Sequence, residues 1–129
     1  MTDRWLSDAW VATGAAEAAE LTGPPSLSGS VLVEVTDGPD GDVTLHADFA
    51  EGRLVGSGAG APASADLTLT LTDSDARAVL SGALDPSVAF MQGRMKVAGA
   101  MGPLLDLLAL AGTDAARAWR ERLALHTDA

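Results

Sequence analysis

Eight residues of strict alternation, "ADLTLTLT" at 65–72, constrain the fold of this chain more than any other stretch. Leu67, Leu69 and Leu71 fall on one side of an extended backbone, and threonines fall on the other. Threonine is β-branched and suits a half-exposed sheet surface. The stretch therefore predicts a strand in a sheet that buries only one face, so other parts of the chain must cover that face.

Further stretches of alternating residues predict the other strands of this sheet. They cover 31–36, 43–49, 53–58 and 94–99. The turn-forming residues "TDGPDGD" at 36–42 and "EG" at 51–52 are expected to join the first three strands as antiparallel hairpins. The small-residue run "GSGAGAPAS" at 56–64 lacks the helix and the Lys–Ser/Thr pair of a phosphate-binding loop, so we interpret it as a connector.

Helices are expected to cover the apolar face of the sheet. The predicted helices span 3–20, 72–82, 85–93, 103–111 and 114–126, and 22–30 is predicted to be a loop. Thr72 or Asp73 can cap the second helix, and Asp85 can cap the third, with Pro86 at its first position. The order of elements predicts an α+β fold, and 129 residues suit one domain, 1–129.

Two of these helices carry an apolar stripe at helical spacing. In the first helix the stripe is Trp5, Ala9, Ala12 and Ala16. In the last helix it is Ala115, Trp119 and Leu123. Arg117, Arg120 and Arg122 lie off the last stripe. We interpret these arginines as a solvated face, with binding of an anionic headgroup as the less favoured alternative.

Charge and residue usage exclude several classes of function. The net charge of −10 would repel phosphate backbones and anionic membrane surfaces, so nucleic acid is not expected as a partner. No stretch approaches about 18 consecutive apolar residues, so stable membrane insertion is not expected either. The first residues lack the basic and apolar regions of a signal peptide, which favours a cytoplasmic location. Cysteine is absent, which excludes disulfides and thiolate chemistry.

Motifs for catalysis or metal binding are nearly missing. The histidines, His46 and His126, do not have the spacing of metal ligands. No G-x-S-x-G nucleophile turn occurs. His46 and Asp48 share a sheet face, where we favour an exposed pair over a proton-transfer pair. The sequence therefore predicts no catalytic residue, no metal and no cofactor.

The segment 89–111, "AFMQGRMKVAGAMGPLLDLLALA", concentrates flexible and apolar side chains. Met91, Met95 and Met101 lie in it, and methionine adapts to irregular apolar shapes. From the residues alone an ordinary core is favoured over a binding pocket. The helix at 103–111 is apolar on nearly all sides, which is typical of a cavity wall or lid, or of a core or dimer contact.

Two basic residues stand beside this apolar segment. Arg94 and Lys96 share one face of the strand at 94–99. They could hold a carboxylate or phosphate headgroup, but a solvated face is the favoured interpretation.

Three stretches resemble the sterol carrier protein-2 family. These are "DLTLTLTD" at 66–73, "GALDP" at 82–86 and "AFMQGRMKVAGAMG" at 89–102. The opening "WLSDAW" is similar to the start of stand-alone bacterial members, whereas Ala100 stands where many members have Asp or Asn. The resemblance implies a five-stranded, mostly antiparallel twisted sheet covered on one face by helices, with an apolar tunnel between them.

With this resemblance, a pocket is favoured over an ordinary core. It implies non-enzymatic binding and transfer of a hydrophobic small molecule, such as a fatty acid, acyl-CoA or sterol. The predicted ligand-binding residues are Leu45, Phe49, Leu69, Leu71, Phe90, Met91, Met95, Val97, Met101, Leu104, Leu105 and Leu108. A small enzyme on the same scaffold, or a protein-interaction module using 89–111, remains an alternative, and a homodimer is allowed.

Overall fold

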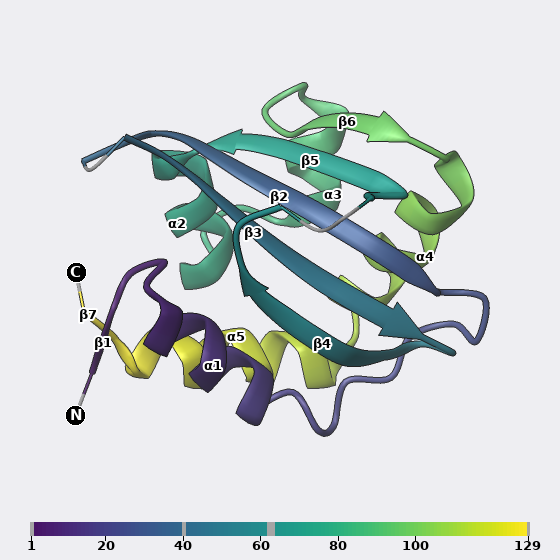
Figure 1. Ribbon diagram of the computed structural model, residues 1–129, viewed down its shortest axis with the longest axis horizontal. Helices are drawn as coiled ribbons and strands as arrows, with labels where there is room; N and C mark the ends of the chain where they lie inside the picture. Colours follow the sequence, from purple (N-terminus) through teal and green to yellow (C-terminus); the bar gives the residue numbers. More distant parts are fainter. Residues whose placement is uncertain (1, 40, 62–63, 129) are drawn as a thin grey trace.

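The computed structural model describes residues 2–39, 41–61 and 64–128. Its strands are β1 (Asp3–Arg4), β2 (Gly29–Gly38), β3 (Gly41–Ala50), β4 (Arg53–Ala59), β5 (Leu67–Thr72), β6 (Lys96–Gly99) and β7 (Thr127–Asp128). Its helices are α1 (Asp8–Ala16), α2 (Asp73–Ser81), α3 (Pro86–Met91), α4 (Met101–Ala111) and α5 (Asp114–Leu125). Figure 1 shows one large sheet with the helices gathered on one side of it.

The large sheet has the strand order β4-β3-β2-β5-β6. Three neighbouring pairs are antiparallel, and the central pair of β2 and β5 is parallel, with Val33 opposite Leu69. In β5 the leucines are buried and the threonines are half-buried. The fold class expected from the sequence and from the resemblance is thereby confirmed, with the leucine face turned to the helices.

The turns of the sheet follow the sequence signals in part. Glu51 and Gly52 have φ values of 50° and 84°, the left-handed pair that suits a two-residue hairpin. At 36–42 the strands continue further than expected, to Gly38 and from Gly41, and residue 40 lies outside the described residues. The connector expected at 56–64 is wrong for 56–59, because these residues pair with β3; residues 62–63 lie outside the described residues.

The N-terminal helix is shorter than predicted. Leu6 has a φ of 62°, which a helix cannot include, and Ser7 then caps α1 by accepting a hydrogen bond from the Trp10 amide at 3.2 Å. Residues 3–4 instead form β1, which pairs in parallel with β7. The predicted alanine stripe is also wrong, since Ala9, Ala12 and Ala16 are exposed.

The middle helices begin where their capping residues predict. Thr72 accepts a hydrogen bond from the Asp75 amide at 3.2 Å, and Asp85 accepts one from the Ser87 amide at 2.8 Å. Helix α2 ends at Gly82, whose φ of 86° is left-handed. Helix α4 begins at Met101 rather than at Pro103, because a proline is tolerated in the first turn, where its missing N–H leaves no bond unmade.

Two groups of buried residues form the core between the sheet and the helices. The first consists of Val31, Leu67, Leu69, Leu84, Ala89, Met95 and Leu104. The second consists of Ala18, Leu21, Leu27, Leu110 and Ala116. Phe49 and Leu107 pack against both groups, so the core is continuous along the helical side of the sheet.

Candidate functional site

An apolar cavity of about 320 Å³ lies between the sheet and the helices. Its strand residues are Val33, Val35, Leu45, Leu69 and Leu71, and its α2–α3 residues are Ala76, Val79, Leu80 and Pro86. The rest are Trp5, Leu6, Trp10, Met95, Leu104, Leu107, Leu108, Ala111, Trp119, Arg120 and Leu123. Every lining side chain except that of Arg120 is apolar, so the cavity suits a greasy molecule.

Periodicity explains how the helices supply their part of the wall. In α4 the lining residues are Leu104, Leu107, Leu108 and Ala111, which have the spacing of one helix face. In α5 the same spacing links the buried Ala116 with Trp119, Arg120 and Leu123. Both helices therefore turn one regular face towards the cavity.

The structure brings half of the predicted ligand-binding residues together. Leu45, Leu69, Leu71, Met95, Leu104 and Leu108 all line the cavity. Phe49, Phe90 and Val97 are half-buried and pack against the core beside it. Contact of any of these side chains with a ligand stays a prediction.

The other three predicted residues lie outside the cavity on the surface. Met91 is 81% exposed, and Met101 and Leu105 are each 57% exposed. Leu105 falls off the inward face of α4, and Met91 is the last residue of a short helix that packs through Ala89. The three methionines therefore do not meet in one place. A homodimer contact through the helix at 103–111 stays a prediction.

All three tryptophans line the cavity, which the sequence did not predict. Each indole N–H has a protein acceptor: Asp73 Oδ1 at 2.7 Å from Trp5, Thr127 Oγ1 at 2.8 Å from Trp10, and the Gly14 carbonyl at 2.8 Å from Trp119. Buried tryptophan needs such a partner for its one polar atom. With that atom satisfied by the protein, the indoles contribute apolar surface to the cavity.

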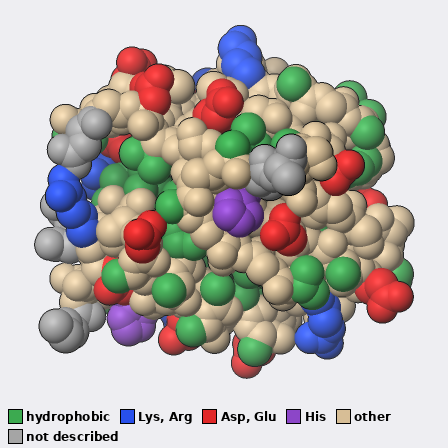
Figure 2. All heavy atoms as spheres, viewed as in Figure 1, with side chains coloured by type: hydrophobic (Ala, Val, Ile, Leu, Met, Phe, Trp, Pro, Cys, Tyr) green, Lys and Arg blue, Asp and Glu red, His purple; other side chains and the backbone are tan. Residues whose placement is uncertain are grey.

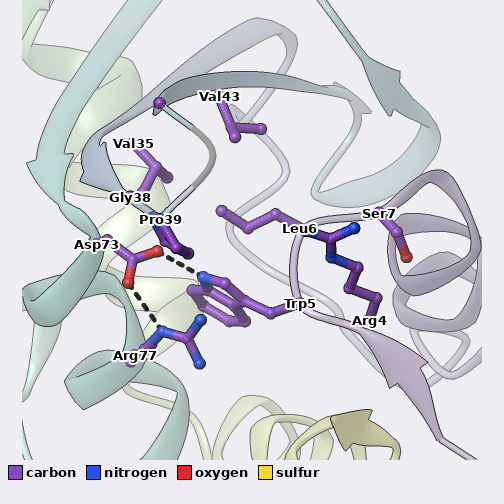
Figure 3. A pocket seen from close by; sticks show the side chains of 11 residues that line it. Arg4, Trp5, Leu6, Ser7, Val35, Gly38, Pro39, Val43, Asp73 and Arg77 are labelled. Carbon is purple, nitrogen blue, oxygen red and sulfur yellow. Dashed lines mark hydrogen bonds and ion pairs between the residues drawn. The ribbon is translucent and has the colours of Figure 1, made fainter. Parts of the chain in front are cut away.

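A more polar pocket, also of about 320 Å³, adjoins the cavity and shares Trp5, Leu6 and Val35 with it. Figure 3 shows Asp73 accepting hydrogen bonds from the Trp5 indole and from Arg77 Nε, the latter at 2.8 Å. The Arg77 guanidinium also lies 4.8 Å from the Trp5 ring centroid, within cation–π range. In Figure 2 hydrophobic side chains gather over this region, on the left of the face shown.

We expect acid to weaken this corner of the protein. Burial raises the pKa of Asp73, but hydrogen bonds from Arg77 and Trp5 outweigh it and hold the pKa below its ordinary value. A lowered carboxyl pKa stabilises the fold above the ordinary value near pH 4, and this stabilisation is lost as pH falls through the folded pKa. Urea unfolding of wild type and Asp73→Asn should show that the difference between their free energies of unfolding shrinks as the pH is lowered below about 4. A difference that stays constant with pH would contradict this account.

The sequence and the fold together place the chain among known proteins. Residues 16–112 match the SCP-2 sterol transfer family. The chain belongs to this family. The resemblance predicted from the stretches at 66–73, 82–86 and 89–102 is thereby confirmed. This membership indicates lipid binding or transfer in general.

Solved structures of the same fold resemble the chain at low sequence identity. A crystal structure of sterol carrier protein 2 has a TM-score of 0.69 and 21% identity, covering 92% of this chain and 96% of that one. A conserved hypothetical protein from Thermus thermophilus has a TM-score of 0.71 and 20% identity, covering 96% and 90%. A palmitated sterol carrier protein 2-like protein from Aedes aegypti has a TM-score of 0.64 and 19% identity, covering 84% of this chain and 92% of that one. No curated protein matches the chain.

The remaining polar candidates from the sequence lie away from the cavity. Arg94 pairs with Asp75 at 2.7 Å, and Lys96 is exposed on β6. His46 Nδ1 lies 3.0 Å from the Gly60 carbonyl, and Asp48 accepts a hydrogen bond from the Ser30 hydroxyl at 2.7 Å. These residues therefore do not supply polar groups to the cavity.

The described parts of the chain offer neither a metal site nor a membrane-spanning helix. Within 2–39, 41–61 and 64–128, no group of three or more acidic or histidine side chains is placed to hold a metal ion. Across the same ranges, every helix is too short or too polar to cross a membrane.

Arg120 is the polar residue of the cavity, and its favoured interpretation as part of a solvated face is wrong. Its side chain is half-buried and lines the cavity wall. The inward face of α5 is wider than the predicted stripe of Ala115, Trp119 and Leu123, because it follows the spacing of Ala116. That spacing could have located Arg120 from the sequence.

Proposed function

We propose that this protein binds one molecule of a hydrophobic lipid in the cavity between its sheet and its helices, and shields it from water without chemical change. The observation that carries the proposal is the cavity itself, whose lining is apolar apart from Arg120. Burial of apolar surface stabilises a bound lipid by roughly 25 cal/mol per Å² removed from water.

The size of the cavity supports a slender ligand. A volume of about 320 Å³ is at the lower end of the ~300–1,000 Å³ typical of small-molecule sites. A single acyl chain suits that volume better than a rigid ring system does. One protein of the same fold was solved in a palmitated form, which supports an acyl chain as the occupant.

The polar groups of the cavity favour holding over catalysis. A reaction on the lipid would need an acid, base or nucleophile beside it. Arg120 remains protonated and can serve none of these roles at ordinary pH. The His46 and Asp48 side chains, which the enzyme alternative would use, do not line the cavity. We therefore propose a carrier rather than an enzyme.

Native mass spectrometry combined with intrinsic fluorescence tests the proposal. Because all three tryptophans line the cavity, saturation with dodecanoate or 1-dodecanol should change their emission. The same titration should give a complex of one lipid per chain in the mass spectrum. The proposal is wrong if fatty acids, fatty alcohols and sterols all leave both the mass and the emission unchanged.

A further inference from the structure

Arg120 is a charged residue in an otherwise apolar wall. It lies on α5, and its Nη1 donates a hydrogen bond to the Ala111 carbonyl at the end of α4, at 3.0 Å. A guanidinium carries five N–H donors, and this carbonyl is the acceptor that the structure gives it. Most of its hydrogen-bonding capacity is therefore available to a bound molecule.

The other arginines of the helices, and Arg94 between α3 and β6, have acidic partners. Arg77, Arg94, Arg117 and Arg122 each form an ion pair. Among the described residues, Arg120 forms none. A cation that is partly removed from water without an anionic partner carries a desolvation cost, which a bound anion would offset.

Asp85 is the acidic residue whose charge acts on Arg120, but its carboxylate is hydrogen-bonded to other groups. Burial lowers the pKa of the Arg120 guanidinium, while the charge of Asp85 raises it and that of Arg117 lowers it. The Asp85 carboxylate accepts hydrogen bonds from the Ser87 and Val88 amides at the start of α3. It contributes to the field at Arg120 but does not occupy its donors.

A third pocket, also more polar than the cavity, meets the cavity at Arg120. Its volume is about 230 Å³, and it shares Leu80 and Arg120 with the cavity. Asp85, Arg117 and Glu121 also line it, so its two acids balance its two arginines. Arg120 thus lies where the apolar cavity gives way to a polar pocket between α2 and α5, which is where the headgroup of an amphiphile would lie.

We propose that Arg120 binds the headgroup of the lipid and selects single-chain lipids with an anionic headgroup over neutral ones. The acyl chain then extends along the cavity towards Trp5 and Leu6. Charge-assisted hydrogen bonds from guanidinium to carboxylate or phosphate are among the strongest that a side chain offers. This inference rests on the proposed function, since it assigns one end of the same cavity.

The test compares ligands that share a chain and differ in the headgroup. Dodecanoate, dodecyl phosphate and 1-dodecanol are titrated by displacement of a fluorescent lipid from wild type, Arg120→Gln, Arg120→Lys and Arg122→Gln. Arg122 is the matched control, because it lies on the same helix and lines neither the cavity nor either polar pocket. Circular dichroism establishes that each variant is folded.

Arg120→Gln should weaken binding of at least one anionic ligand, dodecanoate or dodecyl phosphate, by about tenfold or more. The affinity for 1-dodecanol should stay within about twofold of the wild-type value. Arg120→Lys should restore part of the loss, and Arg122→Gln should resemble wild type. If dodecanoate shows the loss, the headgroup is a carboxylate; if only dodecyl phosphate does, it is a phosphate.

Equal affinities of wild type and Arg120→Gln for both anions would overturn the assignment. An equal loss in Arg122→Gln would overturn it too, because the effect would then be a general one of charge on α5. Failure of every ligand, 1-dodecanol included, to bind wild type would instead count against the proposed function.

Discussion

An Ala111→Trp variant is expected to lose lipid binding almost completely, with affinity reduced by about a hundredfold or more. Ala111 is the last residue of α4, and its small side chain lines the cavity. An indole at this position would occupy space that the acyl chain needs. Displacement of a fluorescent fatty acid measures the loss.

The same variant distinguishes a cavity from a packed core. Extra atoms forced into a packed core cost about 1–3 kcal/mol, whereas atoms placed in a void need not displace their neighbours. We therefore expect urea unfolding of Ala111→Trp to give nearly the wild-type stability. Ala109→Trp is the matched control, because Ala109 is exposed on the same helix and should tolerate the indole without loss of binding. Full binding by Ala111→Trp would contradict the assigned cavity.

Replacing Leu67 by alanine should lower the free energy of unfolding by about 3 kcal/mol, within the 2–5 kcal/mol typical of buried leucines. Leu67 is 1% exposed and lies in the middle of the sheet, opposite Val31 on β2 and Gly99 on β6. It packs in the core but does not line the cavity, so its loss reports on packing alone. The total free energy of unfolding of a domain is typically only about 5–15 kcal/mol, so this effect is large.

The neighbouring residue on the same strand provides the comparison. Thr68 lies opposite Leu32 and Ala98, on the face of the sheet away from the helices. Thr68→Ala should change stability by no more than about 1 kcal/mol, which is the span of strand propensity. Urea denaturation of both variants, with equal slopes, measures the difference. Equal losses in the two variants would mean that β5 is not buried on one face as described.

The predictions from sequence succeeded where a local pattern and the packing agree. The alternation at 67–72 predicts both the strand and its buried face, and Thr72 and Asp85 mark the helix starts. The signals are strong there because side-chain direction in a strand, and orphan amides at a helix start, are fixed by backbone geometry.

Elsewhere the predictions failed because tertiary contacts decide the outcome. Met91 and Met101 do not belong to a run of apolar residues at strand or helix spacing. The sequence therefore does not indicate whether their side chains point inward or outward. Leu6 adopts a left-handed backbone that no local signal favours, so the helix begins at Asp8 rather than at residue 3. Arg120 was assigned by its charge, although the spacing from Ala116 places it on the inward face.

The pairing of β1 with β7 imposes an order on the making of the cavity. Asp3 donates its amide hydrogen to the His126 carbonyl at 2.6 Å, and the Trp10 indole bonds to Thr127. Figure 1 shows β1 and β7 side by side. Trp5 and Leu6, which border the cavity, follow directly after β1. On the ribosome, where residues are added from the N-terminus onward, this pairing cannot form until residues 126–128 have emerged. The nascent protein therefore passes through a stage in which its sheet has been synthesised and its cavity is still open.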